Sequence, residues 1–193
     1  MGMQWTIDGV VKCLKEDKIG IFPCDTIWGI IGRANSDVVR KIRSAKGRTE
    51  HKGFIILVPN AATIPEWIVD FNDDAEELIK EYWPGPLSLI FYKAPHIDGC
   101  LTGNQATIAI RYPKFGPLNT LLDTLGEPII SSSVNFSSHH YLNNLQRTPP
   151  RLLELMDFVY DSDLPPLGKE STIINTTTRP MSIARQGSLV VNL

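Results

Sequence analysis

The segment IGIFPCDTIWGII, residues 19–31, decides the fold class of this chain. Residues 19–23 and 27–31 are short, apolar and rich in β-branched side chains, and the polar step Cys24-Asp25-Thr26 separates them. This pattern predicts two strands, or one bent strand, with Thr26 at the junction. A sheet that begins this way needs helices or further strands to cover its apolar faces.

The rest of the chain supplies both kinds of element. Apolar residues recur at helical spacing after Thr6 and after Ser36, which are the expected N-caps of two helices. The predicted helices cover residues 6–17, 36–46, 73–82, 118–125 and 150–156. The further predicted strands cover residues 54–58, 87–92, 107–112, 129–134, 158–160, 172–175 and 183–184. The fold class is therefore α/β of the mixed α+β kind, with a twisted mixed sheet of about seven strands flanked by helices.

Length, composition and charge narrow the class of protein. The 193 residues, 42% hydrophobic and 21% charged, fit one folded domain over residues 1–193. The net charge of -2 argues against binding long nucleic acid by bulk charge. No apolar run approaches the ~18 residues that span a bilayer, and three widely spaced cysteines suit reduced thiols. We therefore expect a cytoplasmic protein without a membrane contact.

Several enzyme classes are excluded by motif spacing. The stretch Gly168–Ser171 resembles the end of a phosphate-binding loop, but Asp163 stands where its first glycine is needed. The four histidines lack the spacing of a metal site, so we expect no protein-held metal. No serine lies in a G-x-S-x-G elbow, which argues against an acyl-transfer hydrolase.

Cations adjoin predicted buried structure at three places. Lys46 ends a predicted helix and Arg48 and Lys52 follow it, while Arg111 and Arg185 lie at predicted strands. A strand arginine between apolar neighbours needs an anionic partner, because burying an unpaired cation costs several kcal/mol. Either a carboxylate of the protein or an anionic ligand must supply that charge. A solvated helix end is the alternative interpretation of Lys46 and Arg48.

The stretch Ser131-Ser132-Ser133-Val134-Asn135 places hydroxyl and amide groups directly after a predicted strand. Such groups can donate hydrogen bonds to a phosphate or an amino-acid headgroup at the end of a sheet. A polar turn that bonds its own backbone is the alternative. The residues alone thus predict a cytosolic domain with an anion-binding cleft.

Six segments in order resemble the YrdC family of threonylcarbamoyl-adenylate synthases, over about residues 5 to 187. They are Pro23-Cys24-Asp25-Thr26-Ile27-Trp28-Gly29, Lys46-Gly47-Arg48, Trp83-Pro84-Gly85-Pro86-Leu87-Ser88-Leu89, Thr107-Ile108-Ala109-Ile110-Arg111-Tyr112-Pro113, Ser133-Val134-Asn135 and Glu170-Ser171-Thr172-Ile173-Ile174. The resemblance implies a twisted mixed sheet around a concave basic cleft. The chain resembles the short bacterial-type form of the family, which has no C-terminal extension domain.

The resemblance also implies a reaction. Members join L-threonine, bicarbonate and ATP into threonylcarbamoyl-AMP and pyrophosphate, with Mg²⁺ accompanying the ATP. Other proteins then transfer the threonylcarbamoyl group to an adenosine of certain tRNAs, so these transferases are the expected partners. Such a nucleotidyltransferase needs positioning and fixed positive charge rather than a protein nucleophile.

The resemblance also implies roles for the residues that match the functional positions of the family. Lys46 and Arg48 are the expected catalytic residues, holding the phosphates together with Lys52. The remaining ATP-binding positions are Thr107, Ser133, Asn135 and Arg185. The threonine pocket is expected at Thr26, Arg111, Ser131 and Ser171, where Arg111 can bind the carboxylate in bidentate fashion.

Four positions depart from the family pattern: Cys24, Trp28, Thr49 and Val134 replace a threonine, a tyrosine, a proline and an alanine. The Ser-Gly that often follows the Ser-Ala-Asn step is Ser137-Ser138. These departures keep an alternative open, namely a member of the fold that acts on another carbamoyl substrate or serves as a non-catalytic RNA-binding module. The hydroxyl and amide groups at fixed positions favour the enzyme, because contact with an RNA backbone would not require them.

Overall fold

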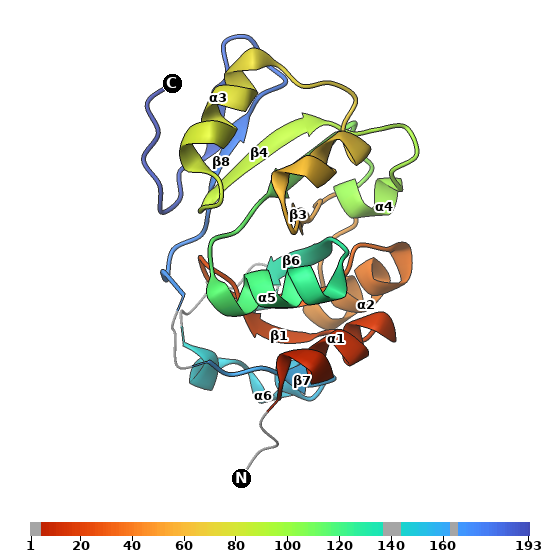
Figure 1. Cartoon of the computed structure of the whole chain (residues 1–193). Coiled ribbons are helices and arrows are strands. Elements are labelled where there is room, and N and C mark those ends of the chain that lie inside the picture. The colour runs from red at the N-terminus through yellow and green to blue at the C-terminus, as the bar shows by residue number, and fades with distance from the viewer. Residues whose placement is uncertain (1–4, 137–143, 163–165) are drawn as a thin grey trace.

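The structure is a computed structural model, and it describes residues 5–136, 144–162 and 166–193. Within them the strands form one sheet in the order β7-β1-β2-β6-β3-β5-β4-β8-β9 (Figure 1). Its strands are β1 (Gly20–Pro23), β2 (Trp28–Arg33), β3 (Ile55–Leu57), β4 (Leu87–Tyr92), β5 (Thr107–Arg111), β6 (Ile129–Ser133), β7 (Phe158–Val159), β8 (Thr172–Asn175) and β9 (Ser182–Arg185). The sheet is mixed, as the sequence predicts, but it has nine strands in the described residues rather than about seven.

The opening segment is a hairpin of two strands, which decides between the alternatives left open by the sequence. β1 pairs antiparallel with β2, and Cys24, Asp25, Thr26 and Ile27 form the turn between them. The Cys24 backbone N–H donates to the Ile27 carbonyl at 3.1 Å and closes this turn. Thr26 therefore lies at the end of two strands.

Alternation along the strands separates two hydrophobic cores. Ile30 belongs to one core and its neighbour Ile31 to the other, and Ile56 and Leu57 in β3 divide in the same way. Successive side chains of a strand point to opposite faces, so each sheet face receives its own apolar set. Helices α1 (Ile7–Lys15) and α5 (Gly116–Leu125) cover one face and lie in front of the strands in Figure 1. Helices α2 (Ser36–Lys46), α3 (Asp73–Tyr82) and α4 (Gly99–Thr102) contribute to the other core.

The N-cap of α1 is the predicted residue, whereas the N-cap of α2 is not. The Thr6 hydroxyl accepts a hydrogen bond from the Gly9 backbone and caps α1 as expected. The predicted cap Ser36 is wrong, because Asn35 caps α2 through its side-chain oxygen to the Val38 N–H. Asn35 has the extended backbone of a cap, while Ser36 already lies inside the helix.

The short elements are those that sequence periodicity predicts least well. The 3-10 helix η1 (Ala61–Glu66) and the four-residue helix α4 have too few turns to show an apolar stripe. The predicted helix over 150–156 is shorter, as α6 (Pro150–Leu153), and the small 3-10 helix η2 (Leu145–Arg147) precedes it. Part of the polar stretch 135–144, residues 137–143 with Ser137 and Ser138, lies outside the described residues.

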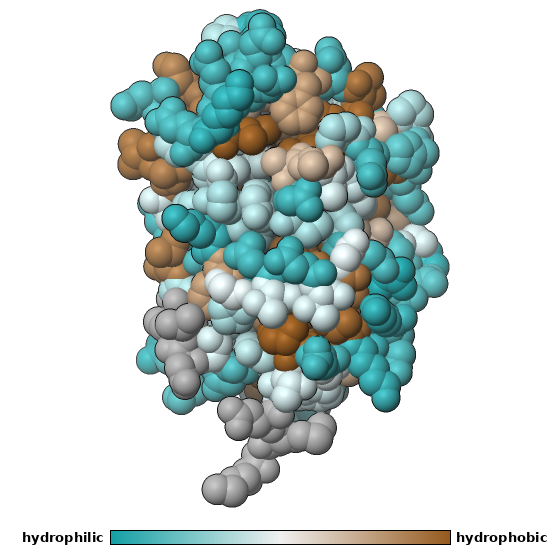
Figure 2. Space-filling model, viewed as in Figure 1, coloured by the Kyte–Doolittle hydropathy of each residue, from teal (hydrophilic) through white to brown (hydrophobic). Residues whose placement is uncertain are grey.

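Hydrophilic residues predominate on the outer surface over α5, and hydrophobic residues form smaller groups around it (Figure 2). This distribution agrees with a helix that turns its leucines toward the sheet. None of the described helices combines the length and the apolar character that crossing a membrane requires.

Candidate functional site

A cavity of about 390 Å³ lies over the middle of the sheet. Its floor is a row of directly paired residues across four adjacent strands: Ser131 of β6, Ile55 of β3, Ala109 of β5 and Ile90 of β4. Paired residues on neighbouring strands share one face of a sheet. Ile55 also packs against the core under α1 and α5, so the cavity is on that side of the sheet.

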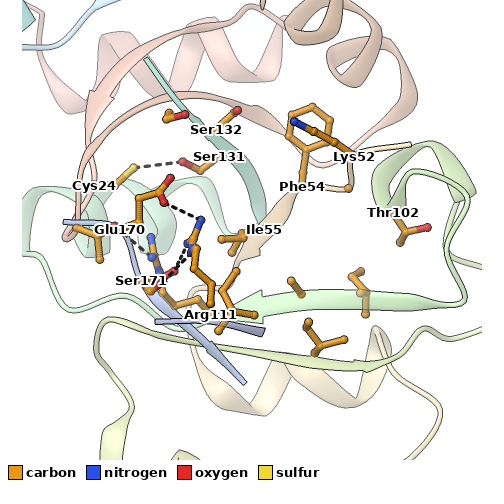
Figure 3. Close-up of a pocket in the computed structure, with 18 of the residues that line it drawn as sticks. Cys24, Lys52, Phe54, Ile55, Thr102, Arg111, Ser131, Ser132, Glu170 and Ser171 are labelled. Carbon is orange, nitrogen blue, oxygen red and sulfur yellow. Dashed lines mark hydrogen bonds and ion pairs between the residues drawn. The ribbon is translucent and has the colours of Figure 1, made fainter. Parts of the chain in front are cut away.

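Polar residues surround this largely apolar floor. Figure 3 shows Lys52 and Thr102 on one side of the cavity, here called the Lys52 end, and Cys24, Glu170 and Ser171 on the other, here called the Glu170 end. The described lining residues include four cations, Arg48, Lys52, Arg111 and Arg185, and a single carboxylate, Glu170.

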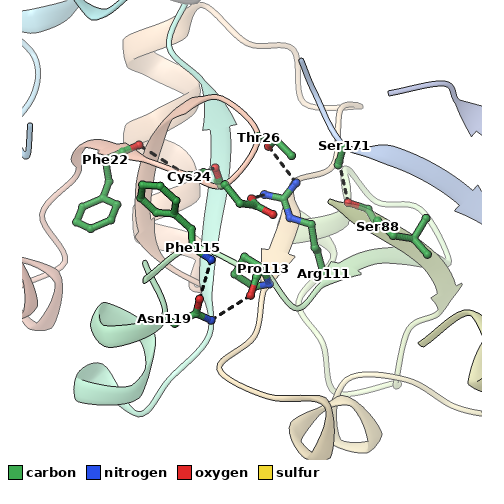
Figure 4. Close-up of polar contacts among 12 residues, drawn as sticks. Phe22, Cys24, Thr26, Ser88, Arg111, Pro113, Phe115, Asn119 and Ser171 are labelled. Carbon is green, nitrogen blue, oxygen red and sulfur yellow. Dashed lines mark hydrogen bonds and ion pairs between the residues drawn. The ribbon is translucent and has the colours of Figure 1, made fainter. Parts of the chain in front are cut away.

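Arg111 forms a buried ion pair at the end of β5. Its Nη2 lies 3.0 Å from the Asp25 carboxylate, and both side chains are at most 4% exposed. Its Nη1 donates to the Thr26 hydroxyl at 3.2 Å (Figure 4). The Asp25 oxygens otherwise accept no hydrogen bond from the described residues, so the guanidinium is what balances this buried charge. Of the two alternatives left by the sequence, a carboxylate of the protein supplies the anion for Arg111.

Three hydrogen-bonding contacts and one ion pair fix the residues around Ser171. The Arg185 guanidinium donates to the Ser171 carbonyl and hydroxyl, each at 3.0 Å, and its Nη1 lies 3.2 Å from the Glu170 carboxylate. The Ser171 hydroxyl also contacts the Ser88 hydroxyl at 2.9 Å (Figure 4). Burial lowers the pKa of Arg185, Glu170 raises it, and the nearby Arg111 lowers it again.

The backbone of this corner depends on a glycine. A Cβ on Gly187 would lie 2.2–2.3 Å from backbone atoms of residues 170–172, far closer than any real contact. The chain after β9 can therefore pass beside Glu170 and Ser171 only with no side chain at this position.

Arg48 is anchored at the Lys52 end. Its Nη2 donates to the Gly53 carbonyl at 2.7 Å, and its guanidinium lies over the Phe54 ring, 4.9 Å from the centroid. Burial lowers the pKa of Arg48, and the neighbouring Arg43 lowers it further. Neither Arg48 nor Lys52 is paired with a carboxylate among the described residues, so their charges are available to an anion.

Lys46 points elsewhere, although the sequence places it beside Arg48. Its Nζ donates to the carbonyls of Ser133 and Asn135, and it lies 3.2 Å from the Asn135 side-chain oxygen. Burial lowers the pKa of Lys46 to about 7, and the Arg48 charge acts in the same direction. Lys46 thus holds the end of β6 in place and does not line the cavity.

Cys24 is a residue that the sequence did not assign to the site. Its thiol lies 3.5 Å from the Ser131 hydroxyl, and burial raises its pKa to about 11. A Cβ on Gly29 would lie 2.6 Å from that hydroxyl and 2.9 Å from the thiol. The glycine of the opening segment therefore makes room for this contact.

Nine of the predicted site residues come together in the cavity, from segments far apart in the chain. They are Thr26, Arg48, Lys52, Thr107, Arg111, Ser131, Ser133, Ser171 and Arg185. The other two, Lys46 and Asn135, form hydrogen bonds with each other and do not line the cavity. Sequence reasoning missed Asp25, although Arg111 needed an anion, and Glu170, although it directly precedes Ser171.

The described residues include no group of three side chains able to hold a metal ion. The two carboxylates nearest the cavity are engaged, Asp25 by Arg111 and Glu170 by Arg185. A divalent cation would therefore fit here when the phosphates of a nucleotide supply most of its ligands, as is usual for Mg²⁺.

The chain is similar to a known protein family and to several of its members. The model of the family Sua5_yciO_yrdC, described as "Telomere recombination", matches residues 12–187. A threonylcarbamoyl-AMP synthase of Pyrococcus abyssi is 27% identical over 187 residues, which are 96% of this chain and 55% of that protein. A putative threonylcarbamoyl-AMP synthase of Mycobacterium leprae is 31% identical over 186 residues, 96% of this chain and 84% of that protein.

Among solved structures, that of P. abyssi Sua5 complexed with L-threonine matches with a TM-score of 0.90 and 27% identity. The match covers 98% of this chain and 56% of that one. The chain therefore spans little more than half the length of the Pyrococcus protein, and most of the length of the mycobacterial one.

Proposed function

Because the chain belongs to the Sua5/YciO/YrdC family, we propose that it is a threonylcarbamoyl-AMP synthase, an enzyme of the nucleotidyltransferase class. It would join L-threonine, bicarbonate and ATP, and release pyrophosphate. The observation that carries this proposal is the cavity itself. It gathers residues that match family positions from β5, β6, β8 and β9 and from the segments after β1 and α2, and relatives over nearly the whole chain carry this name.

The Lys52 end suits a triphosphate. Arg48 and Lys52 have no carboxylate partner in the part of the chain that the structure describes, so both charges can stabilise phosphate oxygens as negative charge shifts to the leaving pyrophosphate. Stacking on Phe54 and the bond to Gly53 hold Arg48 in one orientation before the substrate arrives. Thr107 and Ser133 line the same cavity and are the proposed contacts to the nucleotide.

Lys46 and Asn135 would act indirectly in this conformation. Lys46 bonds the backbone at Ser133 and Asn135, which keeps the polar end of β6 beside the cavity. We therefore assign Lys46 a positioning role, in addition to the phosphate contact that the family motif predicts.

The Glu170 end suits the amino acid, and in the proposal Thr26, Arg111, Ser131 and Ser171 bind L-threonine there. The reaction needs no nucleophile of the protein. The threonine amine adds to carbon dioxide from bicarbonate and loses a proton, and a carbamate oxygen then attacks the α-phosphorus. The bond from that phosphorus to the bridging oxygen breaks, and the electrons leave with pyrophosphate.

Mg²⁺ would arrive with ATP and neutralise part of the phosphate charge. Proteins that transfer the threonylcarbamoyl group to tRNA are the proposed consumers of the product. The relatives' name is the support for this place in tRNA modification.

The proposal is tested by pyrophosphate release from ATP and Mg²⁺, with L-threonine and bicarbonate omitted in turn and with L-serine as comparison. Release that needs both substrates is expected. Arg48→Ala should slow it at least about tenfold, the loss typical of a charge that stabilises a transition state. Arg40, exposed on α2 and paired with Asp37, provides the control variant Arg40→Ala, which should keep the full rate. Absence of release, with duplex RNA bound instead, would favour the RNA-binding module.

A further inference from the structure

The two ends of the cavity differ in their balance of charge. Arg111 is paired with Asp25, and Arg185 is paired with Glu170, so each positive charge at the Glu170 end has a negative partner. At the Lys52 end, Arg48 and Lys52 have no carboxylate partner among the described residues. A polyanion is therefore favoured at the Lys52 end, whereas the Glu170 end favours a ligand that carries both signs of charge.

Glu170 and Asp25 are not equivalent as partners for such a ligand. Asp25 is buried beneath Arg111, and it does not line the cavity. Glu170 lines the cavity, and its side chain is 41% exposed. It meets Arg185 through Oε2, and its Oε1 makes no ion pair or hydrogen bond within the described residues. Glu170 is thus the carboxylate of the described lining that can reach a ligand.

We propose that Glu170 binds the α-ammonium group of the amino-acid substrate, while the guanidinium groups beside it face the carboxylate. The inference rests on the proposed function and adds a residue to it. A free amino acid is a zwitterion with its two charges on adjacent groups, and Glu170 and Arg185, which pair with each other and both line the cavity, present the complementary charges. The wall selects for a free amino group and against a simple carboxylic acid.

The variant Glu170→Gln removes the charge of Glu170 and should leave its neighbours in place. Arg185 keeps its two hydrogen bonds to Ser171 after the charge of Glu170 is removed, so the guanidinium should stay in place. The matched control is Glu127→Gln, because Glu127 pairs with Arg33 at 2.9 Å with a similar exposure of 44% and does not line the cavity.

Titration calorimetry with a non-hydrolysable ATP analogue present tests the inference, using L-threonine and its deamino analogue 3-hydroxybutanoate. Glu170→Gln should raise the Kd of L-threonine at least about tenfold, the size expected for a lost hydrogen bond between charged groups. The Kd of the deamino analogue should not rise in the variant, because this ligand has no amino group to lose a contact, and the Kd of the ATP analogue should not change. Glu127→Gln should change none of the three.

Each other outcome has a distinct meaning. An equal loss for L-threonine and its deamino analogue would show that Glu170 only orients Arg185, which would overturn the inference and leave the proposed function standing. An unchanged Kd of L-threonine in Glu170→Gln would also overturn it. Failure of the wild-type protein to bind L-threonine would refute the proposed function, and the inference with it.

Discussion

The ion pair between Arg111 and Asp25 should contribute strongly to stability as a pair. Its two side chains are at most 4% exposed, so Asp25→Asn would leave the guanidinium buried without a counter-charge while preserving the volume. Removing one partner of a buried pair costs about 3–5 kcal/mol of unfolding free energy. In a domain of this size that corresponds to a fall in Tm of roughly 6–20 °C.

Urea unfolding followed by tryptophan fluorescence measures this cost. Arg111→Met should destabilise similarly, and the double variant should lose about 2 kcal/mol less than the two single losses added together, because it leaves no lone charge. The surface pair of Asp74 and Arg179 supplies the control, since Asp74→Asn should cost less than about 1 kcal/mol. Additive losses, or a cost of Asp25→Asn within about 0.5 kcal/mol of zero, would show that the two charges do not stabilise each other.

Three further variants or treatments test other contacts. Because burial lowers the pKa of Lys46 from 10.5 to about 7, the unfolded chain binds more protons than the native one above that pH. Stability therefore rises with pH in this window, and the unfolding free energy of wild type relative to Lys46→Met should grow by on the order of 1–2 kcal/mol from about pH 7 to about pH 9. A constant difference in urea unfolding would contradict this. Gly187→Ala should cost about 1–3 kcal/mol by the same assay, because its Cβ meets backbone atoms. It should also weaken L-threonine binding in calorimetry, and wild-type affinity would argue against a rigid wall at Ser171. Iodoacetamide at about pH 8 should leave Cys24 unmodified in the native protein and alkylate it in urea, because burial raises the thiol pKa. Peptide mass spectrometry reads this out, and rapid native labelling would show that the thiol is accessible.

Sequence patterns predicted the elements that are long or strongly patterned. The helix Asp73–Tyr82 and the strands Leu87–Tyr92 and Thr172–Asn175 have the predicted bounds. Apolar periodicity and the turn after Tyr82 carry enough local information for these. The edge strands β7 and β9 were predicted with bounds that differ by one residue at their ends, whereas the four-residue helix α4 was not predicted. Tertiary contacts rather than local pattern decide so short a helix.

The site was predictable as a set of residues and not as a set of contacts. Motif order brought Thr26, Arg111 and Ser171 into one prediction, and the cavity contains all three. The partner of Arg111 was not predictable, because Asp25 is 86 positions away and local spacing carries no information on such a distance. The direction of Lys46 was missed for a similar reason, since the carbonyls that it bonds belong to a distant strand end.

In the proposed reaction, this cavity joins L-threonine, a carbon from bicarbonate and AMP. Mass spectrometry of the products formed from ¹³C-bicarbonate, L-threonine and ATP tests it most directly. The expected products are threonylcarbamoyl-AMP that carries one labelled carbon and pyrophosphate. Unlabelled AMP alone, or ADP and phosphate, would contradict it, because the carbamate would then not have attacked the α-phosphorus.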